Sequence, residues 1–396
     1  PAAGIAPAKW EAMARAGFRA LKNGDLVAAQ TALETALLRG APPNLVLPGW
    51  RFAVQDTNAT DAALTHHALT AMPRVDAVTA NALQATPVPV RNAAATTVAT
   101  GAEPAQAKVP APLASIIILA LNQLEHTKKC VESLVAFTRD PFELILVDNG
   151  STDATAEYFA KLRSLHGNIK VITNRGNRGF AGGNNQGLAI AQGEVLVLLN
   201  NDTIVTPGWL EGLTAPLLAD KSIGLTGPVS NRVSGAQQIP TSYADDEAML
   251  QFARTWTAQS AGQIQSANRL VGFCLAFRRD VLEAIGGLDE KFGSGNFEDD
   301  DFCLRAKFAG FSSRIARSVF IHHTGSQTFK GAKIDYRDAM LRNWNYFISK
   351  WQFGATASIE RGYPIPSSKP ASLALKVELP GLDKTHATEA RNHWQE

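Results

Sequence analysis

The sequence predicts an α/β fold in which a mostly parallel sheet carries helices on both faces. Short apolar runs rich in β-branched residues alternate with amphipathic segments along the middle of the 396-residue chain. The runs are Ser115–Ala120, Glu143–Asp148, Ile169–Thr173 and Val195–Asn200, and the first amphipathic segment extends to about Phe137. Strands of a parallel sheet are apolar at consecutive positions because both of their faces are buried, and they need helical crossovers. A chain of this length suffices for roughly two to three domains.

Four segments of different composition divide the chain. Residues 1–76 form a small N-terminal α-helical region, in which 10–39 predict two short helices with small residues where they meet. This hairpin resembles one tetratricopeptide repeat, although an ordinary helical hairpin explains the same spacing. Residues 77–112 are rich in Ala and Pro and predict a linker. The regular α/β pattern occupies 113–351, and 352–396 is a C-terminal tail.

Composition argues against several classes of protein. The 38 Lys and Arg against 36 Asp and Glu give a net charge of +2, which argues against the basic face that nucleic-acid binding needs. Cys130, Cys274 and Cys303 are far apart and lack CxxC spacing, so a reducing compartment is favoured over a disulfide framework or zinc ribbon. No apolar run approaches the ~20 residues of a transmembrane span, and the first ten residues do not resemble a secretory signal. We therefore expect a cytoplasmic protein.

Polar residues follow the predicted strands. These residues are Asn122, Asp148, Asn149, Asn174 and the run 200–202. In sheets of this kind, ligands bind outside the carboxyl ends of the strands, so these side chains are candidates for a binding site. The Asp148 carboxylate could accept a hydrogen bond from a nucleobase N–H, but the same residues also suit a tight turn with a helix cap.

A glycine-rich segment occupies residues 177–187. It lacks the GxxxxGK[ST] and GxGxxG patterns, so it is not one of the usual phosphate loops. Gly179, Gly182 and Gly183 would let backbone amides approach a ligand, or they would let a helix pack closely. The sequence leaves these two interpretations open.

A single carboxylate, Asp202, follows the most hydrophobic predicted strand. A buried carboxylate needs a partner, and one carboxylate alone does not build a divalent-cation site. The candidate partners are His322 and His323, which point to opposite faces if they lie in a strand. Spacing from Ser326 selects His322.

Four consecutive acidic residues, Glu298 to Asp301, stand between Phe297 and Phe302. Acidic residues are favourable in the first turn of a helix, and Asp301 with Arg305 fits an i,i+4 ion pair. Four adjacent carboxylates exceed what a helix end needs, and the aromatic flanks indicate burial. Burial and mutual repulsion raise carboxylate pKa values toward those of a general base, so we favour a catalytic role.

These segments, in this order, resemble a family 2 inverting glycosyltransferase of the GT-A fold, most closely its bacterial rhamnosyltransferase-like branch. The resemblance covers roughly residues 114–351. The matching stretches are SIIILALNQ, LILVDNGSTD, NRGNRGFAGGNNQG, VLVLLNNDT, VGFCLAFRRDVLEAIGGLDEKF, FEDDDFCLR, VFIHHTGS and NWNYFISKW.

The resemblance implies roles for particular residues. Asp299 would be the catalytic base, with Glu298 and Asp301 supporting it or orienting the acceptor. Asp202, the one acidic residue where the family has an Asp-x-Asp motif, would bind Mg²⁺ or Mn²⁺ together with His322. The implied donor-binding residues are Asn122, Asp148, Asn177, Gly179, Asn184, Asn185, Asn201 and Asp202.

The resemblance also implies the substrates. The donor would be a dTDP-, UDP- or GDP-sugar, and the acceptor a glycan, a lipid-linked sugar or a protein, as in bacterial glycan biosynthesis. No nucleic-acid partner is expected. The enzyme would work in the cytoplasm or peripherally at the inner face of the membrane. The alternatives are a nucleotidyltransferase on a related fold and a non-catalytic sugar-binding or scaffold protein.

Overall fold

The structure is a computed structural model that describes part of the chain. It describes residues 113–325, 336–354, 357–359 and 362–379, together with a few positions between 13 and 36. The predicted linker at 77–112 and Ser326 lie outside the described residues. Two compact units are present: residues 1–111 with 243–251, and residues 112–242 with 252–396.

Within residues 1–111, the described positions lie in two helical stretches, between 13 and 20 and between 29 and 36. Gly17 lies directly against Leu33, because a Cβ at Gly17 would overlap that side chain. Ala29 and Ala36 are fully buried. The two predicted helices therefore pack closely at their small residues, and the tetratricopeptide-like interpretation stays a prediction.

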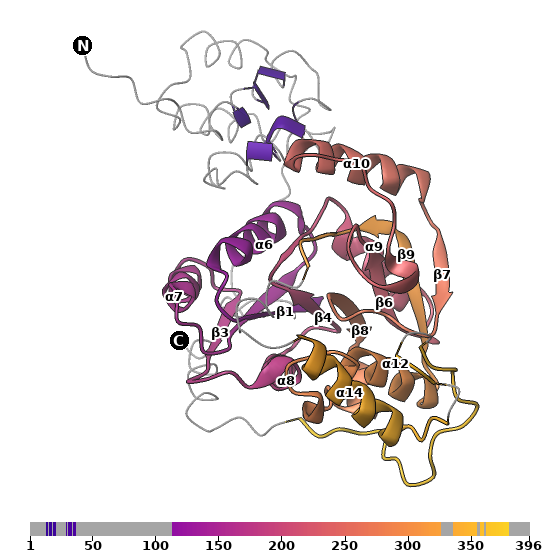
Figure 1. Cartoon of the computed structure of the whole chain (residues 1–396). Helices are drawn as coiled ribbons and strands as arrows, with labels where there is room; N and C mark the ends of the chain where they lie inside the picture. The colour runs from indigo at the N-terminus through magenta and orange to yellow at the C-terminus, as the bar shows by residue number, and fades with distance from the viewer. Residues whose placement is uncertain are drawn as a thin grey trace, which may run out of the picture. The chain divides into compact units, whose positions relative to one another are not determined.

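The second unit is built on an eight-stranded mixed sheet of order β3-β2-β1-β4-β8-β6-β9-β7 (Figure 1). Strand β8 pairs antiparallel with both β4 and β6, and β7 pairs antiparallel with β9; the remaining pairs are parallel. The strands are β1 Ala114–Ala120, β2 Phe142–Asp148, β3 Ile169–Thr173, β4 Val195–Asn200, β6 Ile223–Val229, β7 Ile264–Ala267, β8 Cys274–Arg278 and β9 Ser312–Phe320.

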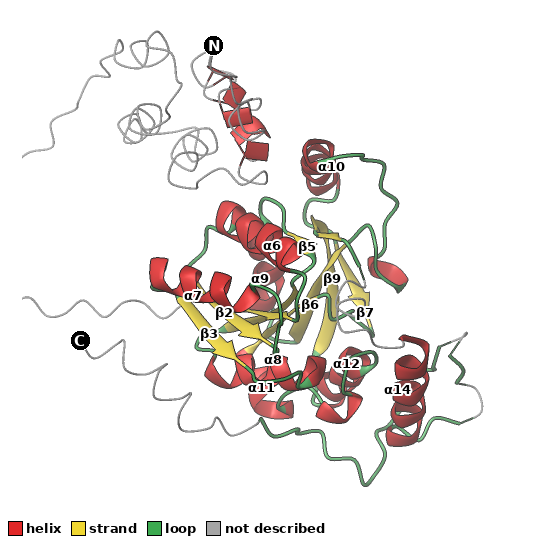
Figure 2. Cartoon of the chain, turned by 60° about the vertical axis from the view of Figure 1, so that its left-hand side comes forward, coloured by secondary structure: helices red, strands yellow, loops and turns green. Residues whose placement is uncertain are grey.

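Helices cover both faces of this sheet, as Figure 2 shows: α6, α7 and α9 on one face, and α8, α11 and α12 on the other. The helices are α6 Leu124–Phe137, α7 Thr155–Leu165, α8 Gly179–Ile190, α9 Trp209–Ala219, α10 Asp246–Gln259, α11 Arg279–Ile285, α12 Glu298–Phe308 and α14 Tyr336–Lys350, with short 3₁₀ turns η2 Gly235–Gln237 and η3 Glu290–Phe292. The predicted α/β architecture is confirmed.

The four predicted strands agree with β1 to β4 to within one residue at each end. All seven residues of β1 are buried, because α8 packs on one face of this strand and its neighbours flank both edges. The sequence predicts no strand at β6, β7 or β8, which together with β9 complete the sheet beyond β4.

Two features position the residues that follow the sheet. A separate two-stranded sheet pairs β5, Thr203–Ile204, with β10, His322–His323. A cluster of buried side chains fixes α14 against α12; its members are Phe292, Leu304, Trp344, Phe347 and Trp351.

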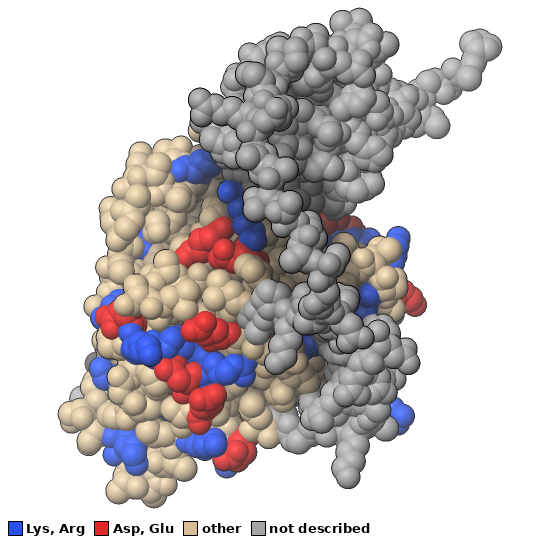
Figure 3. Space-filling view, turned by 180° about the vertical axis from the view of Figure 1, so that it is seen from behind, with Lys and Arg blue, Asp and Glu red and all other residues tan. Residues whose placement is uncertain are grey.

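The molecular face in Figure 3 mixes basic and acidic side chains, with no extended area of one sign. This mixture matches the near-neutral composition. Within the described residues, no helix combines the length and the apolar character needed to cross a bilayer.

Candidate active site

The four acidic residues form the first turn of α12. Glu298, Asp299, Asp300 and Asp301 are 5%, 7%, 1% and 0% exposed, respectively. Carboxylates at this position are favoured by the partial positive charge of the helix N-terminus. Burial of four acidic groups in a row nevertheless requires specific partners, and each residue has a different set.

The turn that leads into this helix has an unfavourable backbone conformation. Asn296 and Phe297 have φ angles of 78° and 71°, in the left-handed region that non-glycine residues rarely adopt. The Asn343 amide from α14 stabilises the turn, since its Nδ2 donates to the carbonyls of Phe292 and Gly295, both at 2.6 Å. Such strain costs of order 1–3 kcal/mol per residue and is concentrated at functional sites.

Asp299 is held by backbone amides. Its Oδ2 accepts a hydrogen bond from the Gly272 N–H at 2.8 Å, and its Oδ1 accepts one from the Asp300 N–H at 2.9 Å. A Cβ at Gly272 would lie 3.4 Å from the Asp299 Cβ, so the strand-end backbone approaches this carboxylate closely. Both oxygens are oriented without an ion-pair partner that would hold them by charge, and each retains a lone pair for a substrate.

Asp300 has different surroundings. Its Oδ1 lies 2.8 Å from the Arg269 Nε and accepts a hydrogen bond from the Tyr363 hydroxyl at 2.5 Å. Burial and the neighbouring Asp299 charge raise the pKa of Asp300 to about 7, while Arg269 opposes that rise. Burial and the same Asp299 charge raise the pKa of Glu298 well above its ordinary value. Asp300 and Glu298 therefore hold protons more strongly than ordinary carboxylates do.

Asp301 has the contacts of a structural residue. It is fully buried, with its oxygens 2.7 Å from Arg305 Nε and 2.6 Å from Lys350 Nζ. Trp351 Nε1 also donates to it at 3.0 Å. These contacts account for both oxygens, and the role implied by the resemblance, supporting Asp299 or orienting the acceptor, stays a prediction. The predicted i,i+4 ion pair between Asp301 and Arg305 is confirmed.

Asp202 lies beside a histidine, but not the one that the sequence selected. The Nε2 of His323 lies 3.2 Å from the Asp202 Oδ1, and both side chains are nearly buried. The antiparallel pairing of β5 with β10 aligns His323 with Thr203, next to Asp202, and aligns His322 with Ile204. The structure therefore places His323 beside the carboxylate, whereas the metal-ligand role that the resemblance implied for His322 stays a prediction.

Two adjacent residues connect the acidic cluster with the Asp202–His323 pair. Gly272 donates its N–H to Asp299, while the Phe273 ring stacks on the His323 ring with centroids 5.1 Å apart. The Phe273 carbonyl also accepts from the N–H of Asn200, two residues before Asp202. The segment 272–273 therefore brings a candidate base and a candidate metal-binding pair together at the end of β4.

Hydrogen bonds also join the loops after β1 and β2. The Asn122 Oδ1 accepts from the Thr152 N–H at 2.7 Å, and the Asp148 Oδ1 accepts from the Ser151 N–H at 2.9 Å. The Asn177 Oδ1 accepts from the Asn149 Nδ2 at 2.9 Å. The predicted gathering of polar residues at this edge is confirmed, whereas their contact with a nucleotide stays a prediction.

Several predicted donor-binding residues serve the packing of the domain. Asn185 Nδ2 donates to the Leu288 carbonyl, and Asn184 Nδ2 donates to the carbonyl of Phe180 in its own helix. Asn201 Nδ2 donates to the Thr127 hydroxyl of α6. All three asparagines are 3% exposed or less, and their contact with a donor stays a prediction.

The glycine-rich segment likewise serves close packing. A Cβ at Gly183 would overlap Leu119 of β1, and one at Gly179 would overlap the Gly293 carbonyl. Gly179 also has a φ of 77°, which other residues rarely adopt. Of the two interpretations of these glycines, the structure supports helix packing at both positions.

Three residues that contact the site had no signal strong enough to reveal them. Arg269 and Tyr363 lie in segments without a motif. Arg269 precedes Asp300 in the sequence, Tyr363 follows it, and both contact it. His323 was a candidate that spacing rejected. Tyr363 lies beyond residue 351, where the sequence predicts that the α/β region ends. That boundary stays a prediction.

The acidic site lies beyond the strand ends of a mixed α/β sheet with helices on both faces. The glycosyl transferase family 2 model matches residues 115–286 of the chain. The matched segment, which is similar to that family, runs from β1 through α11.

Several known proteins are similar to parts of this chain. Protein y4gI of Sinorhizobium fredii is 26% identical over 61% of this chain, and the chain spans 28% of that relative's length. Glycosyltransferase AglE of Haloferax volcanii is 26% identical over 54% of this chain and 67% of its own length. Among solved structures, GalNAc-T7 with UDP, GalNAc and Mn²⁺ gives a TM-score of 0.48 at 17% identity, over 61% of this chain and 49% of that one.

Proposed function

We propose that this chain is an inverting glycosyltransferase that moves a sugar from a nucleoside-diphosphate sugar to an acceptor hydroxyl. The proposal rests on the way residues 272 and 273 bring Asp299 close to the Asp202–His323 pair. Gly272 orients the Asp299 carboxylate, and Phe273 packs against the His323 that faces Asp202. Displacement at an anomeric carbon needs a base on the acceptor side and charge neutralisation on the leaving group, and these two groups supply them.

Asp299 is the proposed base. At 7% it is the most exposed of the four acidic residues, and its two amide hydrogen bonds fix its orientation. It would take the proton from the attacking hydroxyl as that oxygen bonds to the anomeric carbon. Attack occurs on the face opposite the departing diphosphate, so the anomeric configuration inverts in one step. No covalent carboxylate intermediate is required.

Asp202 and His323 fit a divalent cation. A carboxylate oxygen and an imidazole nitrogen 3.2 Å apart suit Mn²⁺ or Mg²⁺, and His323 Nε2 is buried without a hydrogen bond to any described residue. When bound, such an ion neutralises charge on the diphosphate. Within the described residues, no group of three His, Cys, Asp or Glu side chains is arranged to hold a metal ion, so diphosphate oxygens and water would complete the coordination.

The donor is proposed to occupy the edge formed by the loops after β1 and β2. Asn122 and Asp148 fix the shape of these loops. Asn177, with its Oδ1 bound by Asn149 and by the Gly179 N–H, closes the same edge. A nucleoside bound here would direct its diphosphate toward the end of β4, where Asp202 follows.

A donor screen tests the proposal. The full chain is incubated with UDP-, GDP- and dTDP-sugars, with Mn²⁺ or with EDTA, and released nucleoside diphosphate is measured. We expect release from at least one donor, dependent on the metal. A nucleotidyltransferase would instead release pyrophosphate from a nucleoside triphosphate and a sugar phosphate, and a scaffold protein would release neither. Either result overturns the proposal.

A further inference from the structure

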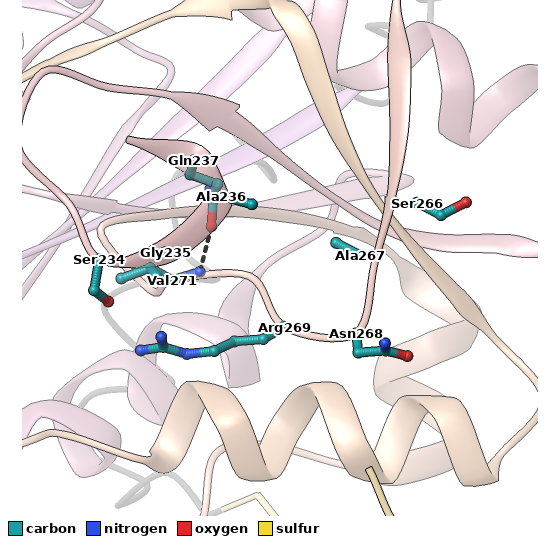
Figure 4. A pocket seen from close by; sticks show the side chains of 9 residues that line it. All are labelled: Ser234, Gly235, Ala236, Gln237, Ser266, Ala267, Asn268, Arg269 and Val271. Atoms are coloured by element: carbon teal, nitrogen blue, oxygen red, sulfur yellow. Dashed lines mark hydrogen bonds between the residues drawn. The ribbon is translucent and has the colours of Figure 1, made fainter. Parts of the chain in front are cut away.

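A hollow of about 250 Å³ lies beside the acidic cluster (Figure 4). The turn 234–237 lines one side, and residues 266–269 with Val271 line the other. None of these residues has an assigned function. Their side chains are small or carry hydroxyl, amide or guanidinium groups, which suits a polar ligand.

The hollow is connected to the proposed base through two successive backbone amides. The Val271 N–H donates to the Gln237 Oε1 at 2.8 Å, and the next N–H, of Gly272, donates to Asp299. Gln237 is 2% exposed and also donates its Nε2 to the Pro228 carbonyl. This wall of the hollow is therefore held in a fixed position relative to Asp299. This is the side from which an acceptor would approach.

Charge in the hollow comes from one residue. Among the lining residues, all of which the structure describes, Arg269 alone is charged. Its Nε faces Asp300, whereas its two terminal nitrogens make no hydrogen bond to any described residue. Figure 4 shows the guanidinium extending toward Ser234. The absent side chain of Gly235 leaves it room, since a Cβ there would lie 3.9 Å from Nη1.

The surroundings add positive charge. Lys307 Nζ lies 3.4 Å from the Asn268 Oδ1, and Arg317 Nη1 donates to the Ala236 carbonyl at 3.3 Å. No carboxylate lines the hollow. Asp300 balances Arg269 only in part, because burial and the Asp299 charge favour its protonated form. The hollow thus presents two guanidinium donors with an excess of positive charge.

We propose that this hollow binds an anionic group of the acceptor, a carboxylate or a phosphate, next to the hydroxyl that receives the sugar. The inference rests on the proposed function. Arg269 would donate two parallel N–H bonds to the anion, a geometry that planar guanidinium groups favour. The acceptor class is then an acidic glycan, with either a uronic acid or a sugar phosphate at the acceptor end.

Binding of three small probes to the full chain tests the inference. The probes are methyl glucuronoside, methyl glucoside 6-phosphate and neutral methyl glucoside, and their dissociation constants are measured by ligand-observed NMR at low salt. The wild-type chain should bind one or both anionic probes at least about tenfold more tightly than the neutral probe. A preference for one anionic probe over the other shows whether the anionic group of the acceptor is a carboxylate or a phosphate.

Two variants separate a specific site from general attraction. Arg269→Gln should abolish the anion preference. Tyr363→Phe also removes a bond to Asp300 but lies outside the hollow, so it should keep the preference. Equal affinity for all three probes, binding of none, or an anion preference that survives Arg269→Gln overturns the inference. Donor hydrolysis by the wild-type chain, measured in parallel, shows separately whether the proposed function stands.

Discussion

Asp299 and Asp300 are adjacent and have the same side chain, yet their surroundings give them different chemistry. Asp299 is oriented by two backbone amides. Asp300 is enclosed by Arg269 and Tyr363, and it is almost completely buried. The first arrangement suits a base that meets substrate. The second suits a group that stabilises its neighbours.

The raised pKa of Asp300 has a consequence for stability. The folded state keeps this proton up to a pH of about 7, whereas the unfolded chain loses it near pH 4. Between these values the folded state binds more protons, so the free energy of unfolding falls as pH rises. Asp300→Asn removes this dependence. Between pH 5 and 7, we expect the melting temperature of the variant to fall less than that of the wild type. The two decreases should differ by at least ~2–4 °C, the shift that ~1 kcal/mol produces.

Melting curves at half-unit pH intervals check this prediction. Glu298→Gln should also flatten the curve, since burial raises the pKa of Glu298 in the same direction. If both variants keep the wild-type dependence of melting temperature on pH, that result would contradict the raised pKa values of Asp300 and Glu298.

The histidine pair gives a second prediction at this scale. His323→Ala should weaken Mn²⁺-dependent binding of a nucleoside diphosphate by about tenfold or more, because His323 is the histidine that faces Asp202. His322→Ala is the matched control and should bind nearly as wild type. Titration calorimetry with GDP, UDP and dTDP, with and without Mn²⁺, measures the difference. A larger loss in His322→Ala would restore the assignment made from the sequence.

Individual residues were predictable where one local pattern fixed the chemistry. The acidic run and the polar strand ends could be read from their neighbours in the sequence. The facing histidine could not, because the pairing of β10 with β5 fixes it. Nor could Arg269 and Tyr363, which meet Asp300 only through tertiary packing.

At the scale of elements, α12 is anchored by a buried ion network. Asp301 binds Arg305 in its own helix and Lys350 at the end of α14. Arg305 in turn donates to the carbonyl of Ile285 at the end of α11, to that of Gly287 just after it, and to the carbonyl of Leu375. Several segments far apart in sequence therefore fix the helix that carries Asp299.

Asp301→Ala should destabilise the protein without a specific effect on chemistry. It leaves the buried Arg305 without its carboxylate, which costs about 3–5 kcal/mol, while Lys350 keeps its ion pair with Asp289. Glu125→Ala removes the partner of the exposed Lys128 and should cost less than about 1 kcal/mol. Urea unfolding of both variants measures the contrast. Normal stability with strongly reduced turnover in Asp301→Ala would instead favour the catalytic role that the resemblance implied.

The first half of the sheet was predictable because its strands are continuous apolar runs with polar ends. The second half was not. In β6 a Gly-Pro pair interrupts the apolar pattern, and the order β4-β8-β6-β9 is set by pairing between distant segments. Strand order of this kind depends on long-range packing, which a local pattern does not encode.

At the scale of the whole molecule, every residue of the candidate site lies between Asn122 and Tyr363. We predict that a chain beginning at Leu113 folds and binds donor nucleotide, because every described strand and every candidate site residue lies beyond residue 112. Its melting temperature should lie within a few degrees of the full chain's, and its donor affinity within about twofold.

Thermal melts and donor titrations of the two chains provide the comparison. Aggregation of the shorter chain, or loss of donor affinity, would show that the N-terminal region covers apolar surface of the domain.

The central claim is that Asp299 is the base of a sugar-transfer reaction, and Asp299→Asn tests it most directly. The substitution keeps shape and hydrogen bonding but removes proton acceptance. Turnover, measured as nucleoside diphosphate released with the best donor and acceptor, should fall by about 10²–10⁴-fold while donor affinity is unchanged. The same change at the half-exposed Asp280, which pairs with Arg278 away from the cluster, should leave turnover near that of wild type. Near-normal turnover in Asp299→Asn would contradict the claim.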